Sequence, residues 1–293
     1  MSFSKEIRKM KIARTIEQVR KLVKTARSQG KSIGFVPTMG ALHIGHISLI
    51  EAAAKKCDFV VVSIFVNPTQ FSPTEDFDKY PRPLDADLKI CRKAGVDVIF
   101  TPTIKQMYGS ENLTWVNVEK LIEPLCGRSR PGFFRGVATV CTKLFNIVVP
   151  DIAFFGQKDA QQAIVIKRMV ADLNMPLKIV ICPTVRQPDG LAVSSRNQYL
   201  TEQQKKDATY VYKSLQNCQE LVDAGVTNVQ KIIHQMRKVL GQVPSIWIDY
   251  VSIVDAETLQ TINHIAGKAL VAVAVKIGST RLIDNILVDS RKQ

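Results

Sequence analysis

The sequence predicts an α/β fold, a Rossmann-like doubly wound parallel sheet followed by a smaller α+β domain at the C-terminus. Two observations indicate it. Up to Pro183, continuous apolar runs of strand length alternate with segments of helical spacing, as in parallel sheets whose two faces are covered by helices. Beyond Pro183 the pattern changes to two long polar helices followed by three strands, which is typical of an α+β domain.

The first part of the chain alternates helix and strand. Thr15, with Gln18 three positions later, is a helix start signal, because each side chain can bond the other residue's backbone amide. The predicted elements that follow are strand Ile33–Val36, helix Ile47–Lys55, strand Phe59–Val66, helix Leu84–Ala94, strand Val96–Phe100 and a short alternating strand Thr114–Val118.

The same alternation continues to Cys182 and then ends. We predict helix Thr139–Val148, strand Ile152–Phe155, helix Ala160–Leu173 and strand Leu177–Cys182. The elements predicted after Pro183 are helices Thr201–Ala224 and Asn228–Leu240 and strands near Trp247–Val254, Ala269–Val275 and Arg281–Leu287. We therefore expect two domains, residues 1–184 and 185–293, with ligands bound beyond the carboxyl ends of the parallel strands.

Charge and composition limit the classes of protein. The net charge is +14, and the first 31 residues carry ten Lys or Arg against two Glu. This balance fits RNA or another polyanion, or a basic face that steers small anionic substrates inward. We favour steering, because aromatic and basic residues do not alternate as in a base-stacking platform, and we expect no nucleic acid partner.

Further features point to a cytoplasmic protein that does not associate with a membrane. The charged first segment has no apolar core of a secretory signal, and the longest apolar run, Ala269–Val275, is far shorter than the ~20 residues that span a bilayer. The six cysteines are scattered, without the paired spacing of a zinc site or a redox dithiol. We expect no disulfide.

The most informative segment is Met39-Gly40-Ala41-Leu42-His43-Ile44-Gly45-His46. It lies between a predicted strand and a predicted helix, a geometry that binds phosphate because the first helical amides lack internal partners. Gly40 and Gly45 allow close approach of a nucleotide, and two imidazoles can donate to phosphate oxygens. The plain alternative is that a histidine at a helix start is only a cap.

Two further polar segments follow predicted strands and a third follows the predicted domain boundary, and each has a structural alternative. Asn67 and Gln70 can bind the hydroxyl and carboxylate of a small acid, or Asn-Pro is a turn and Gln70 faces water. Gly156-Gln157-Lys158-Asp159, followed by Gln161 and Gln162, suits a nucleotide or a charged helix start. The segment 189–197 offers Ser194, Ser195 and Arg196 in a flexible loop that can close over a triphosphate, or is a capping turn.

An acidic cluster comprises Glu75, Asp76, Asp78, Asp85 and Asp87. These carboxylates can contribute to a magnesium site through water. We favour helix capping by Asp85 and Asp87 and assign no metal ligand.

Taken together, these motifs resemble the pantoate–β-alanine ligase (pantothenate synthetase) family of the HIGH-type nucleotidyltransferase superfamily. The likeness covers almost the whole chain. It lies in Pro37 to His46, Phe65-Val66-Asn67-Pro68-Thr69-Gln70-Phe71, Arg135-Gly136-Val137-Ala138-Thr139-Val140, Phe155 to Asp159, Gly190 to Asn197 and Arg281-Leu282-Ile283-Asp284-Asn285.

The resemblance implies an ATP-dependent ligase that condenses pantoate with β-alanine through pantoyl adenylate and releases AMP and pyrophosphate. It implies catalytic roles for His43, His46, Lys158, Ser194, Ser195 and Arg196, with His46 as the proton donor and Mg²⁺ helping to neutralise charge. It places ATP against Met39, Gly40, Ala41, Leu42, His43, Ile44, Gly45, His46, Gly156, Gln157, Lys158, Asp159, Val185, Val193, Ser194, Ser195 and Arg196. Gln70 and Gln162, with Asn67, are expected at the substrate, and the family implies a homodimer and a C-terminal lid domain.

Three positions depart from the family pattern. Phe133 stands where histidine is usual, Ala160 replaces an aromatic residue, and Val193 replaces methionine or leucine. The last two are expected to change pocket fit more than chemistry. Two alternatives remain at this point: another HIGH-motif nucleotidylyltransferase, which forms no amide, and a basic RNA-binding protein.

Overall fold

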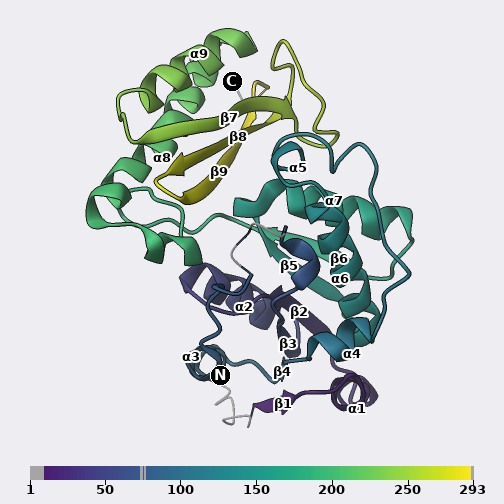
Figure 1. Cartoon of the computed structure of the whole chain (residues 1–293). Helices are drawn as coiled ribbons and strands as arrows, with labels where there is room; N and C mark the ends of the chain where they lie inside the picture. The colour runs from purple at the N-terminus through teal and green to yellow at the C-terminus, as the bar shows by residue number, and fades with distance from the viewer. Residues whose placement is uncertain (1–9, 73–74, 76, 292–293) are drawn as a thin grey trace, which may run out of the picture. The chain divides into compact units, whose positions relative to one another are not determined.

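The computed structural model describes residues 10–72, 75 and 77–291. Part of the predicted basic segment (Lys5, Arg8 and Lys9) and Asp76 of the acidic cluster lie outside these residues. The chain forms two compact units (Figure 1). Unit 1 comprises Met1–Val118, Arg130–Gly156 and Val165–Cys182, and unit 2 comprises Glu119–Ser129, Gln157–Ile164 and Pro183–Gln293. The domain boundary at residue 184 stays a prediction.

Unit 1 is built on a parallel sheet, which confirms the Rossmann-like α/β class. Over the described residues, six strands lie in the order β1-β4-β3-β2-β5-β6, and the neighbours are parallel. The strands are β1 (Lys11–Ala13), β2 (Ile33–Thr38), β3 (Phe59–Ile64), β4 (Val98–Phe100), β5 (Ile152–Gly156) and β6 (Lys178–Cys182). The central strands β2 and β3 are buried along most of their length, which is why the sequence shows continuous apolar runs there.

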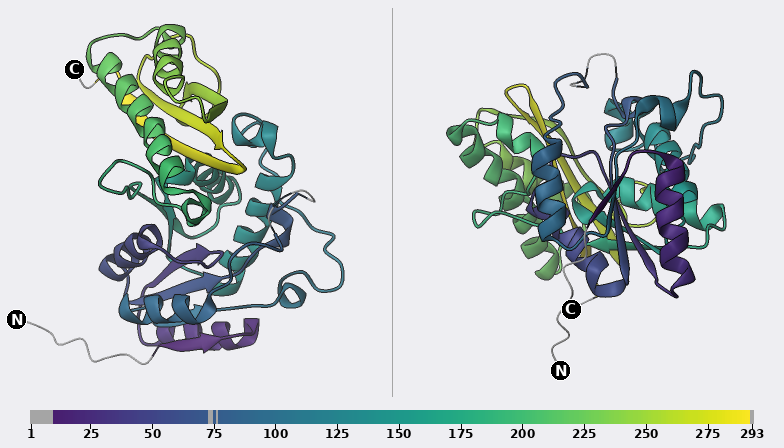
Figure 2. Two further views of the ribbon diagram at one scale, coloured as in Figure 1. Left: turned by 60° about the vertical axis from the view of Figure 1, so that its left-hand side comes forward. Right: turned by 90° about the horizontal axis from the view of Figure 1, so that it is seen from below.

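Helices cover both faces of this sheet. They are α1 (Ile16–Ser28), α2 (Ile44–Lys56), α3 (Leu84–Lys93), α6 (Phe133–Val148) and α7 (Ala160–Asp172), which begins in unit 2 and ends in unit 1. Helix α1 packs against α6 and α2 packs against α3, and the right-hand view of Figure 2 shows α1 and α3 on opposite faces. The predicted capping box is present, since the Gln18 amide donates to Thr15 Oγ1 at 3.1 Å and the Thr15 amide to Gln18 Oε1 at 3.3 Å.

The strand order sets the position of the ligand crevice in unit 1. Strand β2 pairs with β3 on one side and with β5 on the other, so the chain's direction of winding reverses at β2. In doubly wound sheets, ligands bind beyond the carboxyl ends of the strands at such a reversal. The turn after β2, Asn67–Gln70 after β3 and Gly156 at the end of β5 all lie at this edge.

Unit 2 contains the predicted α+β arrangement. Strands β7 (Ile246–Asp255), β8 (Lys268–Ile277) and β9 (Thr280–Asp289) form an antiparallel sheet, and helices α8 (Glu202–Asp223) and α9 (Val229–Leu240) pack together. Leu215, Ile232 and Met236 of these helices and Val271 of β8 are fully buried in one core. The apolar run at 269–275 is a strand, as predicted, and the structure makes it the central strand of this sheet.

Two local predictions need correction, and some short elements were not predicted. Thr114–Val118 is not a strand; this segment is irregular, and the Val116 amide donates to Thr139 Oγ1 at 3.0 Å instead of to a neighbouring strand. Helix α6 begins at Phe133, well before the predicted start at Thr139. Three short elements were not predicted because they are too short to show periodicity: β1, α4 (Ile104–Tyr108) and α5 (Cys126–Ser129). Within the described part of the chain, no helix is long and apolar enough to cross a bilayer.

Candidate active site

The turn between β2 and α2 carries the histidine motif in a tight, left-handed conformation. Gly40 has a φ of 85° and Ala41 a φ of 51°. A Cβ on Gly40 would lie 3.0 Å from Asp87 Oδ2, so a side chain at this position meets both a strained backbone and a crowded space. The Gly40 amide also donates to Thr38 Oγ1 at 3.2 Å. The turn is thus fixed by the protein itself.

The rings of the two histidines accept hydrogen bonds from backbone amides at the start of α2. His43 is the N-cap residue, and its Nδ1 accepts from the Gly45 amide at 3.2 Å; Nδ1 of His46 accepts from the His43 amide at 3.3 Å. The ring centroids are 4.1 Å apart. A ring nitrogen that accepts a hydrogen bond carries no proton, so each neutral imidazole carries its proton on Nε2. The capping alternative is therefore correct in geometry, and the cap itself fixes two rings as Nε2–H donors.

Asp87 holds this turn from helix α3. Its carboxylate accepts from the Leu42 amide at 2.7 Å and from the Ala41 amide at 3.0 Å, and the residue is 1% exposed. Burial raises the pKa of Asp87, while the two amides act in the opposite direction. Asp85 and Asp87 both lie in the first turn of α3, as predicted, but the N-cap residue is Pro83, which makes no side-chain bond, and the Asp87 carboxylate binds the histidine turn. Its contact with a turn 45 residues earlier has no local sequence signal.

Asn67 and Gln70 form a buried pair after β3. Asn67 Nδ2 donates to Gln70 Oε1 at 3.0 Å and to the Gly136 carbonyl at 3.2 Å, and Asn67 Oδ1 accepts from the Tyr108 hydroxyl at 2.6 Å. Both amide hydrogens of Asn67 are thus used within the protein. Gln70 is 8% exposed, which excludes the alternative that it faces water. Its Oε1 is fixed by Asn67, so its NH₂ group is oriented as a donor.

Helix α6 approaches this pair closely because of Gly136. A Cβ at this position would overlap the Thr69 carbonyl oxygen, which no packing adjustment of a side chain can relieve. Glycine in the family block at 135–140 is therefore explained by the approach of α6 to the 3₁₀ turn η1 (Pro68–Gln70).

Arg130 adds a contact that the sequence did not reveal. Its guanidinium binds both carboxylate oxygens of Glu75, at 2.6 and 2.9 Å, and donates to the Gln70 carbonyl at 2.9 Å. The same guanidinium lies over the Phe133 ring, 3.7 Å from its centroid. The Phe133 ring thus packs on an arginine that holds the backbone of Gln70. Glu75 and Arg130 are 55 residues apart, so only the fold brings them together.

The expected site residues are divided between the units. Unit 1 holds Met39 to His46, Asn67, Gln70 and Gly156, and unit 2 holds Gln157, Lys158, Asp159, Gln162, Val185, Val193, Ser194, Ser195 and Arg196.

The segment after β5 is both a charged helix start and an open glycine turn. Residues Gln157–Asp159 form one 3₁₀ turn directly before α7, and Lys158 Nζ lies 3.7 Å from Asp159 Oδ1. Among the described residues, no atom lies within 4 Å of the place of a Cβ on Gly156. Gln161 is buried and bonds the backbone at Leu121, Pro124 and Cys126, so it holds a loop, whereas Gln162 is half-buried.

In unit 2, residues 185–193 form a small hydrogen-bonded hairpin. The Val193 amide donates to the Val185 carbonyl at 3.0 Å, and Arg186 and Ala192 form an antiparallel bridge. Ser194 then caps the 3₁₀ turn Ser195–Tyr199, accepting from the Arg196 amide at 3.3 Å. The capping alternative is again correct. Val185 and Val193, which are both expected at ATP, lie next to each other on the two sides of this hairpin.

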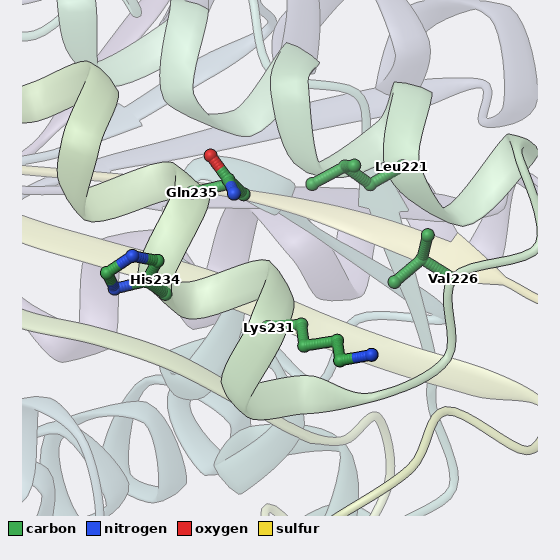
Figure 3. A pocket seen from close by; sticks show the side chains of 5 residues that line it. All are labelled: Leu221, Val226, Lys231, His234 and Gln235. Atoms are coloured by element: carbon green, nitrogen blue, oxygen red, sulfur yellow. The ribbon is translucent and has the colours of Figure 1, made fainter.

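One pocket of unit 2 is lined by other residues. Figure 3 shows a groove of about 220 Å³ at α8 and α9, lined by Leu221, Val226, Lys231, His234 and Gln235. It contains none of the residues expected at a substrate. Within residues 10–72, 75 and 77–291, no three His, Cys, Asp or Glu side chains gather as metal ligands.

This geometry defines a class of protein: a Rossmann-like α/β protein with paired histidines at the start of a helix, at the reversal point of its sheet. The family model of pantoate-beta-alanine ligase matches residues 11–287. Pantothenate synthetase of Acetivibrio thermocellus is 52% identical over 280 residues, which are 96% of this chain and 100% of the relative. The chain belongs to the pantoate–β-alanine ligase family, and it is an enzyme, a ligase.

Solved structures agree with this membership. Pantothenate synthetase from Thermus thermophilus superposes with a TM-score of 0.90 at 42% identity, covering 94% of this chain and 99% of that one. Pantoate-beta-alanine ligase from Francisella tularensis, crystallised with beta-gamma ATP and beta-alanine, gives a TM-score of 0.79 at 37% identity and covers 97% and 99%.

Proposed function

We propose that this ligase joins pantoate to β-alanine with ATP, through a pantoyl adenylate. The pantoate carboxylate attacks the α-phosphorus of ATP and pyrophosphate leaves; the amine of β-alanine then attacks the acyl carbon and AMP leaves. A carboxylate is a poor acyl donor until its oxygen belongs to a good leaving group, which adenylation provides. Family membership and the Francisella relative, whose structure is complexed with beta-gamma ATP and beta-alanine, support this assignment.

The observation that carries the proposal is the pair of fixed Nε2–H donors. His43 and His46 are held by backbone amides at the amino end of α2, where the helix dipole favours an anion. Negative charge grows on the phosphate oxygens as the α-phosphorus is attacked, and donors oriented before the reaction stabilise it without reorganising. The resemblance makes His46 the proton donor; with Nδ1 accepting a hydrogen bond, we propose that its Nε2–H donates a hydrogen bond to these oxygens and keeps the proton.

Residues of the other segments are proposed to bind the nucleotide. Lys158, Arg196 and the hydroxyls of Ser194 and Ser195 bind the triphosphate, and Gln157, Asp159, Val185 and Val193 line ATP with the turn 39–46. Gly156 supports this role, because nothing within the described protein explains the absence of a side chain there. The approach of a ligand to the backbone explains it.

Gln70 and Gln162 are proposed to hold pantoate, with Gln70 also near β-alanine. The support for Gln70 is its orientation: Asn67 and Arg130 fix its side-chain oxygen and its main-chain carbonyl, leaving the NH₂ group as the oriented donor. Asn67 then acts by positioning Gln70, since its own amide hydrogens are already used.

Magnesium is proposed to accompany ATP. Mg²⁺ is usually bound by substrate phosphates, water and one or two carboxylates and seldom by an all-protein cage. The acidic residues fit only that mode, because Asp87 accepts two amides and Glu75 binds Arg130. When bound, Mg²⁺ neutralises phosphate charge.

The test is to incubate the protein with ATP, Mg²⁺ and pantoate, with and without β-alanine, and to follow AMP, pyrophosphate and amide product. The proposal expects pyrophosphate in both mixtures and AMP with amide only when β-alanine is present. Pyrophosphate with a nucleotidylated product but no amide would support a different HIGH-motif enzyme. RNA binding that is steeply salt-dependent, without ATP turnover, would support the RNA-binding alternative.

His46→Ala tests the central observation. Loss of a transition-state donor or general acid lowers rates by about two to four orders of magnitude, and we expect that decrease in pyrophosphate release. His234→Ala, an exposed histidine on α9, is the matched control and is expected to keep full activity. A folded His46→Ala protein with near-normal turnover would remove His46 from the mechanism. The homodimer and the domain boundary at residue 184 also stay proposals, the first testable by sedimentation.

A further inference from the structure

Two buried polar residues stand next to each other in the apolar strand β9 of unit 2. Asp284 is 4% exposed and Asn285 is 5% exposed, while Leu282 and Val288 of the same strand belong to the core. Burying a charge or an amide is unfavourable unless its partners are supplied, so these residues need an explanation beyond the sheet. Successive side chains of a strand point to opposite faces, so the two residues reach different segments of the chain.

Asn285 binds the backbone of the turn that carries Lys158. Its Nδ2 donates to the Gln157 carbonyl at 2.9 Å and to the Lys158 carbonyl at 2.8 Å, and its Oδ1 accepts from Gln157 Nε2 at 2.8 Å. Both amide hydrogens and the oxygen of Asn285 are thus used on two consecutive residues. This arrangement fixes the direction in which the Lys158 side chain leaves the backbone.

Asp284 binds the other segment through Arg186. Its two oxygens accept a bidentate pair from the guanidinium of Arg186, which also donates to the Gly190 carbonyl at 3.2 Å and lies 3.9 Å from the centroid of the Tyr212 ring. A Cβ on Gly190 would overlap that ring, so the hairpin fits closely against it. Arg186 is the residue directly after Val185, which is hydrogen-bonded to Val193.

We propose that Asp284 and Asn285 are positioning residues of the nucleotide site. Asn285 holds the Lys158 turn and Asp284, through Arg186, holds the Val185–Val193 hairpin, so that strand β9 keeps both segments in their ATP-binding geometry. This rests on the proposed function, in which both segments bind ATP. The alternative is that the two residues only stabilise unit 2. The two possibilities differ in whether nucleotide affinity changes separately from stability.

The test is the dissociation constant of a non-hydrolysable ATP analogue, measured by calorimetry with the full chain. Asn285→Leu has nearly the same shape but makes none of the three bonds, and Asp284→Asn loses the bidentate ion pair. Val288→Ala, a core truncation in the same strand, is the matched control for stability. We expect each of the first two variants to weaken the analogue by about tenfold or more, the effect of losing one or two hydrogen bonds. Val288→Ala is expected to lower the melting temperature at least as much but to keep the affinity within about twofold.

Hydrogen exchange provides a second measurement. Amides at 157–159 are expected to exchange faster in Asn285→Leu, and amides at 191–193 faster in Asp284→Asn, with neither change in Val288→Ala. If Asp284→Asn does not fold, Arg186→Lys is measured in its place, because lysine keeps the positive charge but cannot form the bidentate pair of hydrogen bonds. Equal affinities in all variants would overturn the inference. Failure of the unchanged protein to bind the analogue would instead overturn the proposed function.

Discussion

The contact between Asp87 and the histidine turn predicts that the substitution Asp87→Asn changes catalytic activity and the free energy of unfolding in different ways. Asp87→Asn keeps the shape of the side chain and one acceptor oxygen, so one of the Ala41 and Leu42 amides stays bound. The other amide then faces the NH₂ group of the introduced asparagine side chain, and because both groups are donors, that hydrogen bond is lost.

The expected loss of activity follows from the strain in the turn. A non-glycine residue with positive φ, such as Ala41, costs roughly 1–2 kcal/mol, and a hydrogen bond to a charged group contributes roughly 1.5–3 kcal/mol. Removing one such bond lets the turn relax, so we expect kcat/KM for ATP to fall by about 10- to 100-fold, since 1.4 kcal/mol is about tenfold. Asp87 is buried, so solvent does not screen the effect.

Stability is expected to respond differently, because the same substitution removes a buried charge. Burial raises the folded-state pKa of Asp87 above its ordinary value of 3.8. A carboxyl group with a raised pKa contributes stability that is fully present below the unfolded pKa and is lost as pH rises through the folded pKa. The difference in free energy of unfolding between the unchanged protein and Asp87→Asn should therefore become less favourable to the unchanged protein as pH rises above about 4.

Urea denaturation across this pH range and adenylation kinetics at neutral pH measure the two effects. Asp85→Asn is the matched control, since Asp85 lies in the first turn of the same helix, is exposed and loses the same charge. It is expected to leave kcat/KM unchanged. An activity of Asp87→Asn within about threefold of the unchanged protein, or an equal loss in Asp85→Asn, would refute the role of Asp87 in holding the turn.

Three more predictions concern other parts of the chain. Gly136→Ala places a Cβ against the Thr69 carbonyl, so it should destabilise the protein by about 1–3 kcal/mol in urea and raise KM for pantoate by displacing Gln70; a normal KM would contradict the packing argument. Gln70→Ala should weaken pantoate far more than ATP in binding measurements, and equal weakening of both would count against the assignment. Burial raises the pKa of three cysteine thiols to about 12, so they should react with iodoacetamide only after unfolding, and labelling of the folded protein would contradict their burial. These thiols are Cys91, Cys141 and Cys218.

The elements that the sequence predicted are those whose physical signal is local. Continuous apolar runs gave β2, β3 and β5 because a strand covered on both faces must be apolar at every position. Thr15 and Gln18 gave the start of α1 because a cap involves only neighbouring residues. Thr114–Val118 alternates like a strand, but no strand of the described chain pairs with it, and alternation cannot reveal whether a partner exists.

The sequence by itself determined the class of fold, the histidine turn and the family, because periodicity and ordered motifs are properties of short segments. Only the tertiary structure decided what holds those motifs. It showed that Asp87 binds the turn, that Asn67 and Arg130 orient Gln70, and that the amides of Gly45 and His43 fix the tautomers of His43 and His46. Most of these contacts join residues from different helices and strands, and a hydrogen bond across dozens of residues leaves no pattern in either segment. The physical reason is that the packing of the whole chain decides which residue lies close enough to bond a given side chain. The sequence shows only which groups that side chain can donate or accept.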